Sequence, residues 1–366
     1  AQRMLPEQQP ASEQGRASGD ACQALLARVL LYWASPLNNP TNDRQRWTDA
    51  ANAAWALIDK RYRLIDDYGD VFLSWNDEVI FARAFSQANS TEFATWAGRS
   101  GDNGQGVITP TQNMVNAYEM QATGLRPYVE QADGTLTLNA GSGYDPANPY
   151  AGRDPRFYAS VLYDGSVWMG RETEIFYGGL DEANSKVSSQ PWNATQTGYY
   201  LRKFLDESIP PTGSSVKMTS PWIFMRYAEV LLNYAEAKFE EGDEPTARFY
   251  LKQVRQRPGV NMPEVKDSGD ALRERIHNER RVELAFEHHR FFDVRRWKVA
   301  ERTETFPLQK MVITKDETSG TKNYDIQILK NREFRSYQLL LPIPRTEIEK
   351  SLNTLEQNDG YVKTAE

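Results

Sequence analysis

The sequence predicts a mainly α-helical fold in which helical hairpins support a large irregular region with short strands. Apolar residues recur at helical spacing near the N-terminus and again in residues 222–301. By contrast, residues 91–221 hold 15 of the 23 glycines and many Asn, Thr and Pro residues, a composition typical of loops. The helices are therefore expected to form the scaffold, and the loop-rich segment is the place to look for function.

Length and charge exclude several classes of protein. The chain has 366 residues and a net charge of -7, without the clustered Lys and Arg residues that nucleic-acid binding needs. Its single cysteine, Cys22, excludes an intrachain disulfide and a cysteine-based metal site. We treat residues 1–366 as one domain with four parts: a helical hairpin (15–60), a loop-rich ligand-binding region (91–221), further helical hairpins (222–301), and C-terminal loops with a short helix (302–366).

The first hairpin is predicted from two amphipathic runs. One helix begins near Ser18 and stops before Pro36, with an apolar stripe of Leu25, Leu26, Val29, Leu30 and Tyr32. The second runs from about residue 44 to 60, with one face formed by Trp47, Ala50, Ala51, Ala54 and Leu57. Small alanines opposite large apolar partners are typical of tetratricopeptide-like hairpins, which must stack on neighbours to bury their outer faces.

Two further helical units follow the loop-rich region. The second hairpin joins one helix to the next through Gly242-Asp243. Its first stripe is Phe224, Tyr227, Leu231, Tyr234 and Ala235, and its second is Ala247, Tyr250, Leu251 and Val254. A third unit covers residues 268–301, with a bend expected over 288–292. Three such units predict an α-α superhelix.

Strands are expected mainly in the loop-rich region and near the C-terminus. Residues 156–163 alternate apolar and polar side chains, and residues 135–139 and 174–177 are shorter candidates. From Phe306 onward the sequence predicts polar loops and a strand-like segment over 329–334. Pro344 is then expected to open a short helix at Thr346.

A dense block of charges occupies residues 276–298. Glu279, Glu283 and Glu287 stand four residues apart, and the spacing predicts pairs of Arg280 with Glu283 and of Glu287 with Arg290, within an ion-pair network between helices. A metal site built from Glu283, Glu287 and His288 or His289 is the alternative. It is less consistent with the sequence because the flanking arginines would repel a cation.

The sequence offers little for catalysis. All three histidines fall in the same helical unit, and no nucleophile lies in a GxSxG turn, so a hydrolytic triad is not expected. Two carboxylates are enough for a glycosidase, however, and acidic side chains do occur in or beside loops. An α-helical glycoside hydrolase therefore stays an alternative, with Asp66, Asp67, Asp70 and Asp102 as its candidate residues.

Aromatic side chains with polar neighbours in the loop-rich region favour a sugar ligand. A pyranose ring stacks its C-H face on Trp or Tyr, and its hydroxyls bond to polar groups. The predicted ligand-binding residues are Trp96, Arg99, Asp102, Trp168, Trp192, Asn193 and Tyr199. For each aromatic residue, the competing interpretation is that it packs beneath a loop.

Five motifs together resemble the SusD/RagB family of outer-membrane nutrient-binding lipoproteins. They are PTQNMVNAYEM (110–120), NPYAGRDPRFYASVLYDG (148–165), RYAEVLLNYAEA (226–237), NERRVELAFEHHRFFDVRRW (278–297) and LLPIPRTEIEKS (340–351). The resemblance implies a tetratricopeptide-like fold whose motif residues hold the scaffold together, namely Arg153, Asp154, Arg156, Glu229, Glu279 and Arg281. It also implies that the N-terminal segment of the family, with its lipid-attachment cysteine, is absent from this chain.

The resemblance further implies a function. Such proteins are non-catalytic lipoproteins on the outer membrane of Gram-negative, Bacteroidota-like bacteria, where they capture oligosaccharides or polysaccharides for a SusC-like TonB-dependent transporter. Some relatives serve peptide uptake, so a peptide ligand is an alternative. A plain tetratricopeptide adaptor is less consistent because adaptors keep their repeats contiguous. No cofactor is expected, and bound calcium stays open.

Overall fold

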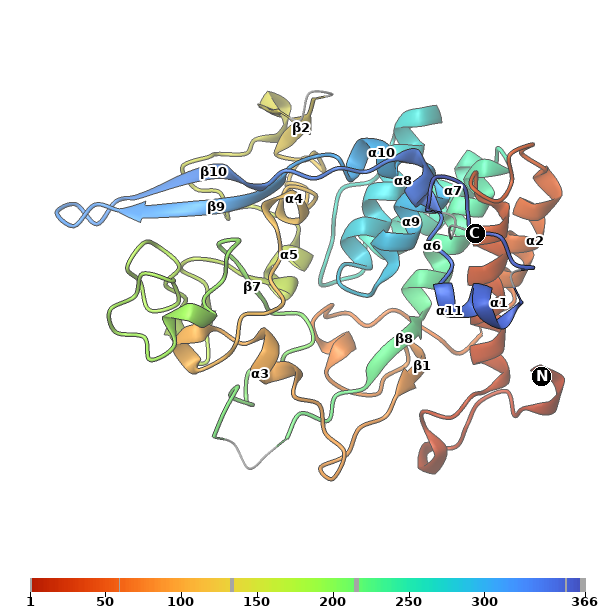
Figure 1. Ribbon diagram of the computed structural model, residues 1–366, viewed down its shortest axis with the longest axis horizontal. Helices are drawn as coiled ribbons and strands as arrows, with labels where there is room; N and C mark the ends of the chain where they lie inside the picture. Colours follow the sequence, from red (N-terminus) through yellow and green to blue (C-terminus); the bar gives the residue numbers. More distant parts are fainter. Residues whose placement is uncertain (1, 59, 132–134, 214–216, 353, 363–366) are drawn as a thin grey trace.

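The protein consists of a helical half and a loop-rich half that lie side by side (Figure 1). The computed structural model describes residues 2–58, 60–131, 135–213, 217–352 and 354–362. The helical half contains α1 (Gly19–Ala34), α2 (Arg44–Trp55), α6 (Tyr227–Glu240), α7 (Glu244–Arg255), α8 (Gly269–Glu283), α9 (His289–Arg296) and α10 (Ala300–Thr303). The predicted mainly α fold is confirmed. No helix in the described ranges combines the length and apolar character needed to cross a bilayer.

The first hairpin packs through small residues. Ser18 caps α1 by accepting from the Ala21 N-H, and Asp43 caps α2 by accepting from the Gln45 N-H. Alanines at the contact let the two backbones approach closely. The buried residues of α2 and the turn after it include all five predicted ones, although the helix ends at Trp55, earlier than expected.

The buried face of α1 differs from the prediction. Leu25, Leu26 and Val29 are exposed, and the contact with the other helices is made by Ala24, Ala27, Leu31 and Ala34. The helical period was right, and the chosen face was right only at Leu30 and Tyr32, which pack against the core. Side-chain size suggested the stripe, whereas close helix packing requires small residues. The large apolar side chains of α1 consequently form an exposed strip.

The second and third units follow the prediction with two corrections. Asp243 caps α7 by accepting from the Thr246 N-H, after Gly242 turns the chain with a φ of +88°. Phe224 belongs to a strand and is exposed, so it is not part of the helical stripe. The third unit breaks at residues 284–288, a few residues before the expected bend, because α8 ends at Glu283.

In the loop-rich half, short strand pairs and short helices cover a second core. Its helices are α3 (Phe93–Ala97), α4 (Gln112–Val115) and α5 (Pro155–Ser160). Its antiparallel pairs are β2 (Tyr128–Glu130) with β3 (Leu136–Leu138), β4 (Val161–Leu162) with β7 (Tyr200–Leu201), and β5 (Val167–Trp168) with β6 (Arg171–Glu172). The core beneath them includes Phe72, Tyr118, Phe157, Tyr199 and Val282, the last contributed by α8. A two-stranded sheet of β1 (Val79–Arg83) and β8 (Trp222–Arg226) joins the halves.

Two strand predictions in this region are wrong. Residues 156–163 begin as helix α5, since Asp154 caps the Arg156 N-H and Pro155 occupies the first helical position. Only Val161 and Leu162 of that segment pair as a strand. Residues 174–177 form no strand either, whereas β3 confirms the strand expected over 135–139.

The C-terminal part contains a long hairpin that the sequence did not predict. Strands β9 (Leu308–Lys315) and β10 (Lys322–Lys330) pair in antiparallel fashion, and the hairpin extends along the loop-rich half (Figure 1). Met311 and Ile313 are buried against that half, and Asp316 accepts three hydrogen bonds in the connecting turn. The strand expected over 329–334 ends at Lys330.

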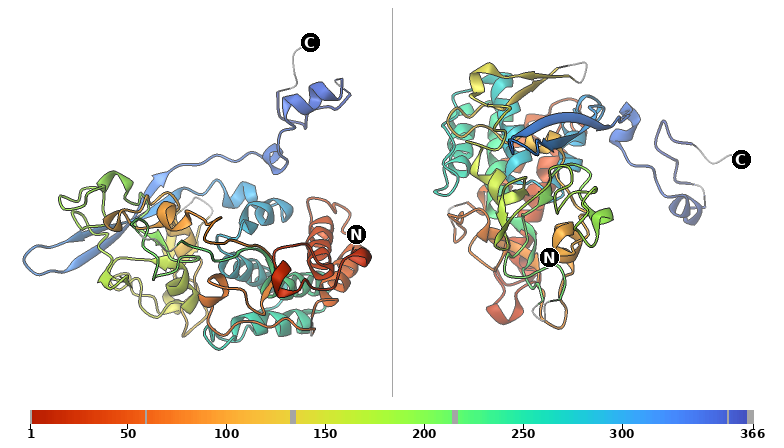
Figure 2. Two further views of the ribbon diagram at one scale, coloured as in Figure 1. Left: turned by 90° about the horizontal axis from the view of Figure 1, so that it is seen from below. Right: turned by 90° about the vertical axis from the view of Figure 1, so that its left-hand side faces the viewer.

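After the hairpin the chain stands away from the rest of the molecule, as both views in Figure 2 show. This arm contains α11 (Arg345–Lys350), which confirms the short helix expected after Pro344. Single turns of 3-10 helix complete the structure: η1 (Gln2–Met4), η2 (Ala11–Glu13), η3 (Asp70–Phe72), η4 (Ser100–Asp102), η5 (Ala140–Ser142), η6 (Pro191–Asn193) and η7 (Ser336–Leu339).

Candidate functional site

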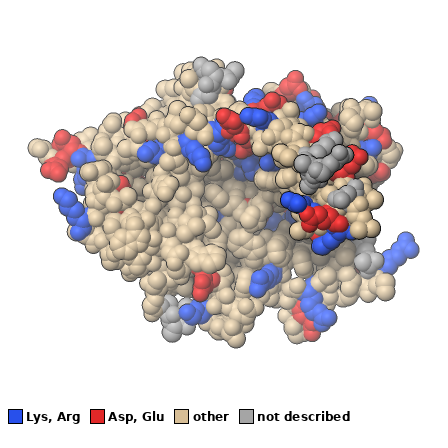
Figure 3. All heavy atoms as spheres, in the orientation of Figure 1, with Lys and Arg blue, Asp and Glu red and all other residues tan. Residues whose placement is uncertain are grey.

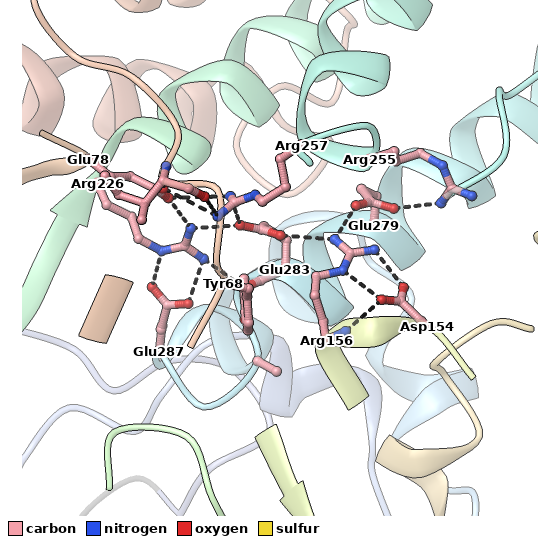
Figure 4. A network of polar contacts seen from close by, with 12 residues as sticks. Tyr68, Glu78, Asp154, Arg156, Arg226, Arg255, Arg257, Glu279, Glu283 and Glu287 are labelled. Atoms are coloured by element: carbon pink, nitrogen blue, oxygen red, sulfur yellow. Dashed lines mark hydrogen bonds and ion pairs between the residues drawn. The ribbon is translucent and has the colours of Figure 1, made fainter. Parts of the chain in front are cut away.

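A buried ionic cluster joins the two halves of the molecule (Figure 4). At its centre the carboxylate of Glu283 accepts from Arg156 at 2.9 Å, from Arg226 at 2.7 Å and from Arg257 at 2.6 Å. We call this cluster the ionic core; its further members are Glu78, Asp154, Arg255, Glu279 and Glu287. The predicted ion-pair network between helices is thus confirmed.

The individual pairs inside the charged block differ from the prediction. Arg280 does not pair with Glu283; its guanidinium donates to Asn233 at 2.7 Å and to Asp293 at 3.4 Å. Glu287 does not pair with Arg290; it accepts from Arg226 and from Lys203, each at 2.7 Å. Helix α8 ends before Glu287, so the spacing rule for a continuous helix does not apply there.

The ionic core holds Glu279, Glu283 and Glu287 in the charged form, because nearby positively charged side chains lower the pKa of each. Burial alone would raise the pKa of Glu287, but the charges of Arg226 and Lys203 outweigh it and lower the pKa to about 2. Glu283 shifts in the same direction, because three guanidinium groups outweigh its burial. Carboxylates held ionised and fully paired act as structural charges, and a proton donor at neutral pH is not found among them.

Other scaffold residues implied by the motifs also make structural contacts. Arg153 donates to the carbonyl oxygens of Pro149, Val115 and Tyr118, and Glu229 accepts from Arg28 at 2.6 Å. Arg281 is different, since among the described residues its side chain makes one hydrogen bond, a donation to the Asn113 carbonyl at 2.7 Å. A structural role is therefore confirmed for the motif set apart from Arg281.

Two of the predicted ligand residues belong to a second ion-pair group in the loop-rich half. Arg99 donates to Asp102 at 2.7 Å and to the Trp168 carbonyl at 2.8 Å. Arg171 bridges Asp102 and Asp181, with bonds of 2.9 and 2.7 Å. Arg99 is buried and Asp102 is shared by two guanidinium groups, so both residues hold the loops together. Ligand binding by Arg99 and Asp102 stays a prediction, and the Arg99-x-x-Asp102 spacing was the signal for their pairing.

Trp168 and Tyr199 also make structural contacts, and their ligand-binding roles stay predictions. Tyr199 is buried and donates its hydroxyl to the Gln112 side chain at 2.6 Å. Trp168 is also buried and lies beneath the guanidinium of Arg202. Tyr199 offers no face to a ligand in this structure and follows the competing interpretation, in which an aromatic residue packs beneath a loop. Trp168 lines a cavity of about 410 Å³.

Trp96 and Trp192 remain as exposed aromatic side chains. Their exposed fractions are 49% and 75%. One turn positions both segments, because Val107 donates its N-H to the Trp96 carbonyl at 2.8 Å and Gly106 lies against the Asn193 carbonyl. A Cβ at residue 106 would come within 2.4 Å of that oxygen, and φ there is +53°, so this approach requires glycine.

Asn193 lies beside Trp192 and is half-buried. Its side-chain amide donates to Gln190 at 2.6 Å, which fixes the residues around the exposed indole. We call Trp96, Val107 and Trp192 the tryptophan surface; all three are exposed. The ligand-binding roles of Trp96, Trp192 and Asn193 stay predictions.

A cavity of about 450 Å³ opens between the two halves, and the sequence did not reveal it. Figure 3 shows this face of the molecule hollowed between the halves, with Lys and Arg atoms along the hollow. The ring centroid of Trp222 lies 5.5 Å from that of Phe93, 5.1 Å from that of Phe204 and 5.9 Å from that of His288. We call it the aromatic cavity; its wall also includes Met114, Arg281, Phe286, Arg290, Phe291 and Phe306.

The turn between α8 and α9 forms part of this wall in an unusual backbone conformation. Phe286 and His288 have φ values of +64° and +67°, which bulky residues adopt rarely and at a cost of about 1 to 3 kcal/mol. Backbone strain of this kind persists where the surrounding structure fixes the residue, and it is common at functional sites. In the sequence, the aromatic residues of this motif could have indicated the cavity wall. The charges of the motif instead indicated a scaffold role.

Helix α3 connects the aromatic cavity with the tryptophan surface. Phe93, on its first turn, lines the cavity, and Trp96, on its last, is exposed to solvent. The segment that contains Val107 and Ile108 is arranged in the same way, since Ile108 lines the aromatic cavity and Val107 is exposed. Flat rings with hydrogen-bonding neighbours suit a ligand that has apolar faces and polar edges.

Comparisons with known proteins agree with this architecture. The profile of the SusD family matches residues 77–361. A SusD-like protein from Bacteroides fragilis NCTC 9343 has a solved structure with a TM-score of 0.76 and 30% identity, over 99% of this chain and 68% of that one. A SusD-like carbohydrate-binding protein from the same strain gives 0.74 and 26%, over 95% and 67%.

A curated relative, SusD-like protein P2 of Formosa agariphila, is 26% identical over 257 residues. The match includes 67% of this chain and 44% of the relative. The chain thus spans less than half of the length of that relative.

Proposed function

The chain belongs to the SusD family, and from this premise we propose that it binds oligosaccharides or polysaccharides at the cell surface without converting them. On this proposal it is a lipoprotein of the bacterial outer membrane and passes its ligand to a SusC-like TonB-dependent transporter. One of its two solved relatives named above is a carbohydrate-binding protein. The observation that carries the proposal is the tryptophan surface beside the aromatic cavity.

The physical argument concerns the two indole rings. An exposed tryptophan loses hydration at low cost when the C-H face of a pyranose covers it, and its fixed geometry limits the entropy lost on binding. The segments that carry Trp96 and Trp192 are held by the same turn, so their backbones are fixed relative to each other. Carbonyl and amide groups near them, including the Asn193 side chain, supply partners for sugar hydroxyls.

A binding role without catalysis is supported by the structural contacts that the acidic residues make. Asp102 pairs with two guanidinium groups, and Asp67 closes a turn by accepting from the Gly69 N-H at 2.7 Å. Glu283 and Glu287 are engaged in the ionic core. A glycosidase needs two carboxyl groups that are free to act on the scissile bond, whereas these four are engaged in ion pairs or in a turn.

The test is isothermal titration of the protein with a panel of soluble glycans. Trp96→Ala and Trp192→Ala are expected to weaken binding about tenfold each, or about 1.4 kcal/mol. Trp33→Ala is a matched control, because Trp33 is 51% exposed but lies on α1 against Arg46. Equal loss in all three variants, or release of shortened products, would contradict the proposal. A ligand displaced by peptides and by no sugar would assign the surface to peptide uptake.

A further inference from the structure

Arg281 and Arg290, on α8 and α9, lack the carboxylate partners that the arginines of the ionic core have. Among the described residues, the Arg290 guanidinium makes no hydrogen bond or ion pair, and the Arg281 guanidinium has a single bond, to the Asn113 carbonyl. Arg156, Arg226 and Arg255, by contrast, each pair with at least two carboxylates. We call Arg281 and Arg290 the arginine pair.

The arginine pair lies between two cavities. Both residues line the aromatic cavity, and both line a second cavity of about 330 Å³. Residues of β2, α8 and the segment from Trp297 to Thr303 form the walls of this second cavity. One wall is a flat stack in which the rings of His277 and Trp297 lie 3.6 Å apart at 12°. Burial lowers the pKa of His277 to about 3, so this histidine adds no positive charge.

The charges around the arginine pair do not balance. Arg275, Arg302 and Arg332 also line these cavities, but they pair with Asp267, Glu274 and Glu304 respectively. Within the described residues, Arg126, Arg281 and Arg290 have no carboxylate partner, and Glu130 is the unpaired carboxylate facing them. Positive charge therefore exceeds negative charge here.

This excess of positive charge destabilises the fold unless a negative group balances it. Arg281 and Arg290 are half-buried. Burial, and then repulsion from Arg290, lowers the pKa of Arg281 to about 9, and burial also lowers the pKa of Arg290. A desolvated charge without an ion-pair partner destabilises a fold, and groups with such shifted pKa values that line a cavity are candidates for a functional site.

We propose that Arg281 and Arg290 bind the anionic group of a glycan, a carboxylate or a sulfate ester, between the aromatic and the second cavity. This inference rests on the proposed function and names the class of its ligand. The planar guanidinium presents paired N-H donors that match two oxygens of either group. The His277 ring, which stacks on Trp297, forms part of the wall of the second cavity beside the sugar ring that bears the charge.

The experiment compares three probes by isothermal titration: uronic-acid oligosaccharides, sulfated galactan oligosaccharides and neutral galacto-oligosaccharides. The protein is expected to bind one of the anionic probes at least tenfold more tightly than the neutral one. Arg281→Gln and Arg290→Gln should each remove most of that preference and leave neutral binding unchanged. The preference should also fall as salt is raised, and the variants should show a weaker salt dependence.

Two further variants test whether the loss of any arginine charge near the cavities would have the same effect. Arg302→Gln removes a mostly exposed arginine that lines the second cavity and is paired with Glu274, so it should change affinity less than threefold. Arg290→Lys keeps the charge but loses the planar donors, and should retain the salt dependence with reduced affinity. Thermal unfolding of every variant shows that the fold is intact.

The outcomes separate this inference from the proposed function. Equal affinity for neutral and anionic glycans would contradict the anionic site, but it would be consistent with the proposed glycan binding. An anionic preference that survives in both glutamine variants would overturn the assignment to the arginine pair. Failure of every glycan in the panel to bind would overturn the anionic site and the proposed function together. The identity of the preferred probe distinguishes carboxylate from sulfate.

Discussion

Neighbouring residues of one helix, Arg280 and Arg281, belong to opposite electrostatic environments. Arg280 points into the helical half, where Asn233 and Asp293 accept its hydrogen bonds. Arg281 points toward the cavities, where one backbone carbonyl is its partner. The ionic core and the arginine pair extend this contrast across the molecule. Charges that the fold itself neutralises hold the two halves together, and charges that it leaves without partners are available to a ligand.

The largest effect is expected from breaking the centre of the ionic core. Glu283→Gln removes the counter-charge of three buried guanidinium groups, and removing one partner of a buried pair costs about 3 to 5 kcal/mol. Urea unfolding should show a loss of that size in the free energy of unfolding. Glu301→Gln, at an exposed position, is the control. A change below about 1 kcal/mol in Glu283→Gln would mean that the core contributes little net stability.

A pH series tests the same core without changing its structure. The folded pKa of Glu287, about 2, lies below its ordinary value of 4.5. The unfolded chain therefore takes up the proton first, so this stabilisation is complete above about pH 5 and is lost as the pH falls toward 2. Its size is on the order of 3 kcal/mol. The variant Glu287→Gln should flatten the acid limb of stability against pH, and an unchanged slope would contradict the assignment.

The smallest effect, and one of opposite sign, is expected at the arginine pair. Arg290→Gln removes a charge that repels Arg281 and lacks a partner among the described residues, so without ligand the protein should gain about 0.5 kcal/mol. Thermal unfolding in ligand-free buffer measures this. A loss of more than about 1 kcal/mol would show that Arg290 is structural, and the contrast with the ionic core would disappear.

The helical scaffold could be predicted from the sequence because its information is local. Apolar spacing, caps such as Asp43 and Asp243, and the breaks at Pro36 and Gly242 act within a few residues. The face of α1 could not be predicted with the same rule. Leu25 and Val29 are the larger apolar side chains, yet close packing on α2 selects Ala24 and Ala27.

The candidate site was predictable only in part. Trp96 and Trp192 proved to be exposed, whereas Arg99, Asp102, Trp168 and Tyr199 make structural contacts. All of these residues look alike in sequence, as polar or aromatic side chains among glycines. Their difference lies in contacts with residues far along the chain, such as Tyr199 with Gln112 and Arg99 with Thr173.

By itself, then, the sequence determined the helical hairpins, the loop-rich segment and the presence of a network of buried charges, because residue type and spacing set these features locally. Only the tertiary structure decided which charges are paired. Glu283 meets Arg156, Arg226 and Arg257, which come from three separate segments, while Arg290 meets no carboxylate among the described residues. Coulomb energy depends on distance in space and on desolvation, and a sequence records neither quantity.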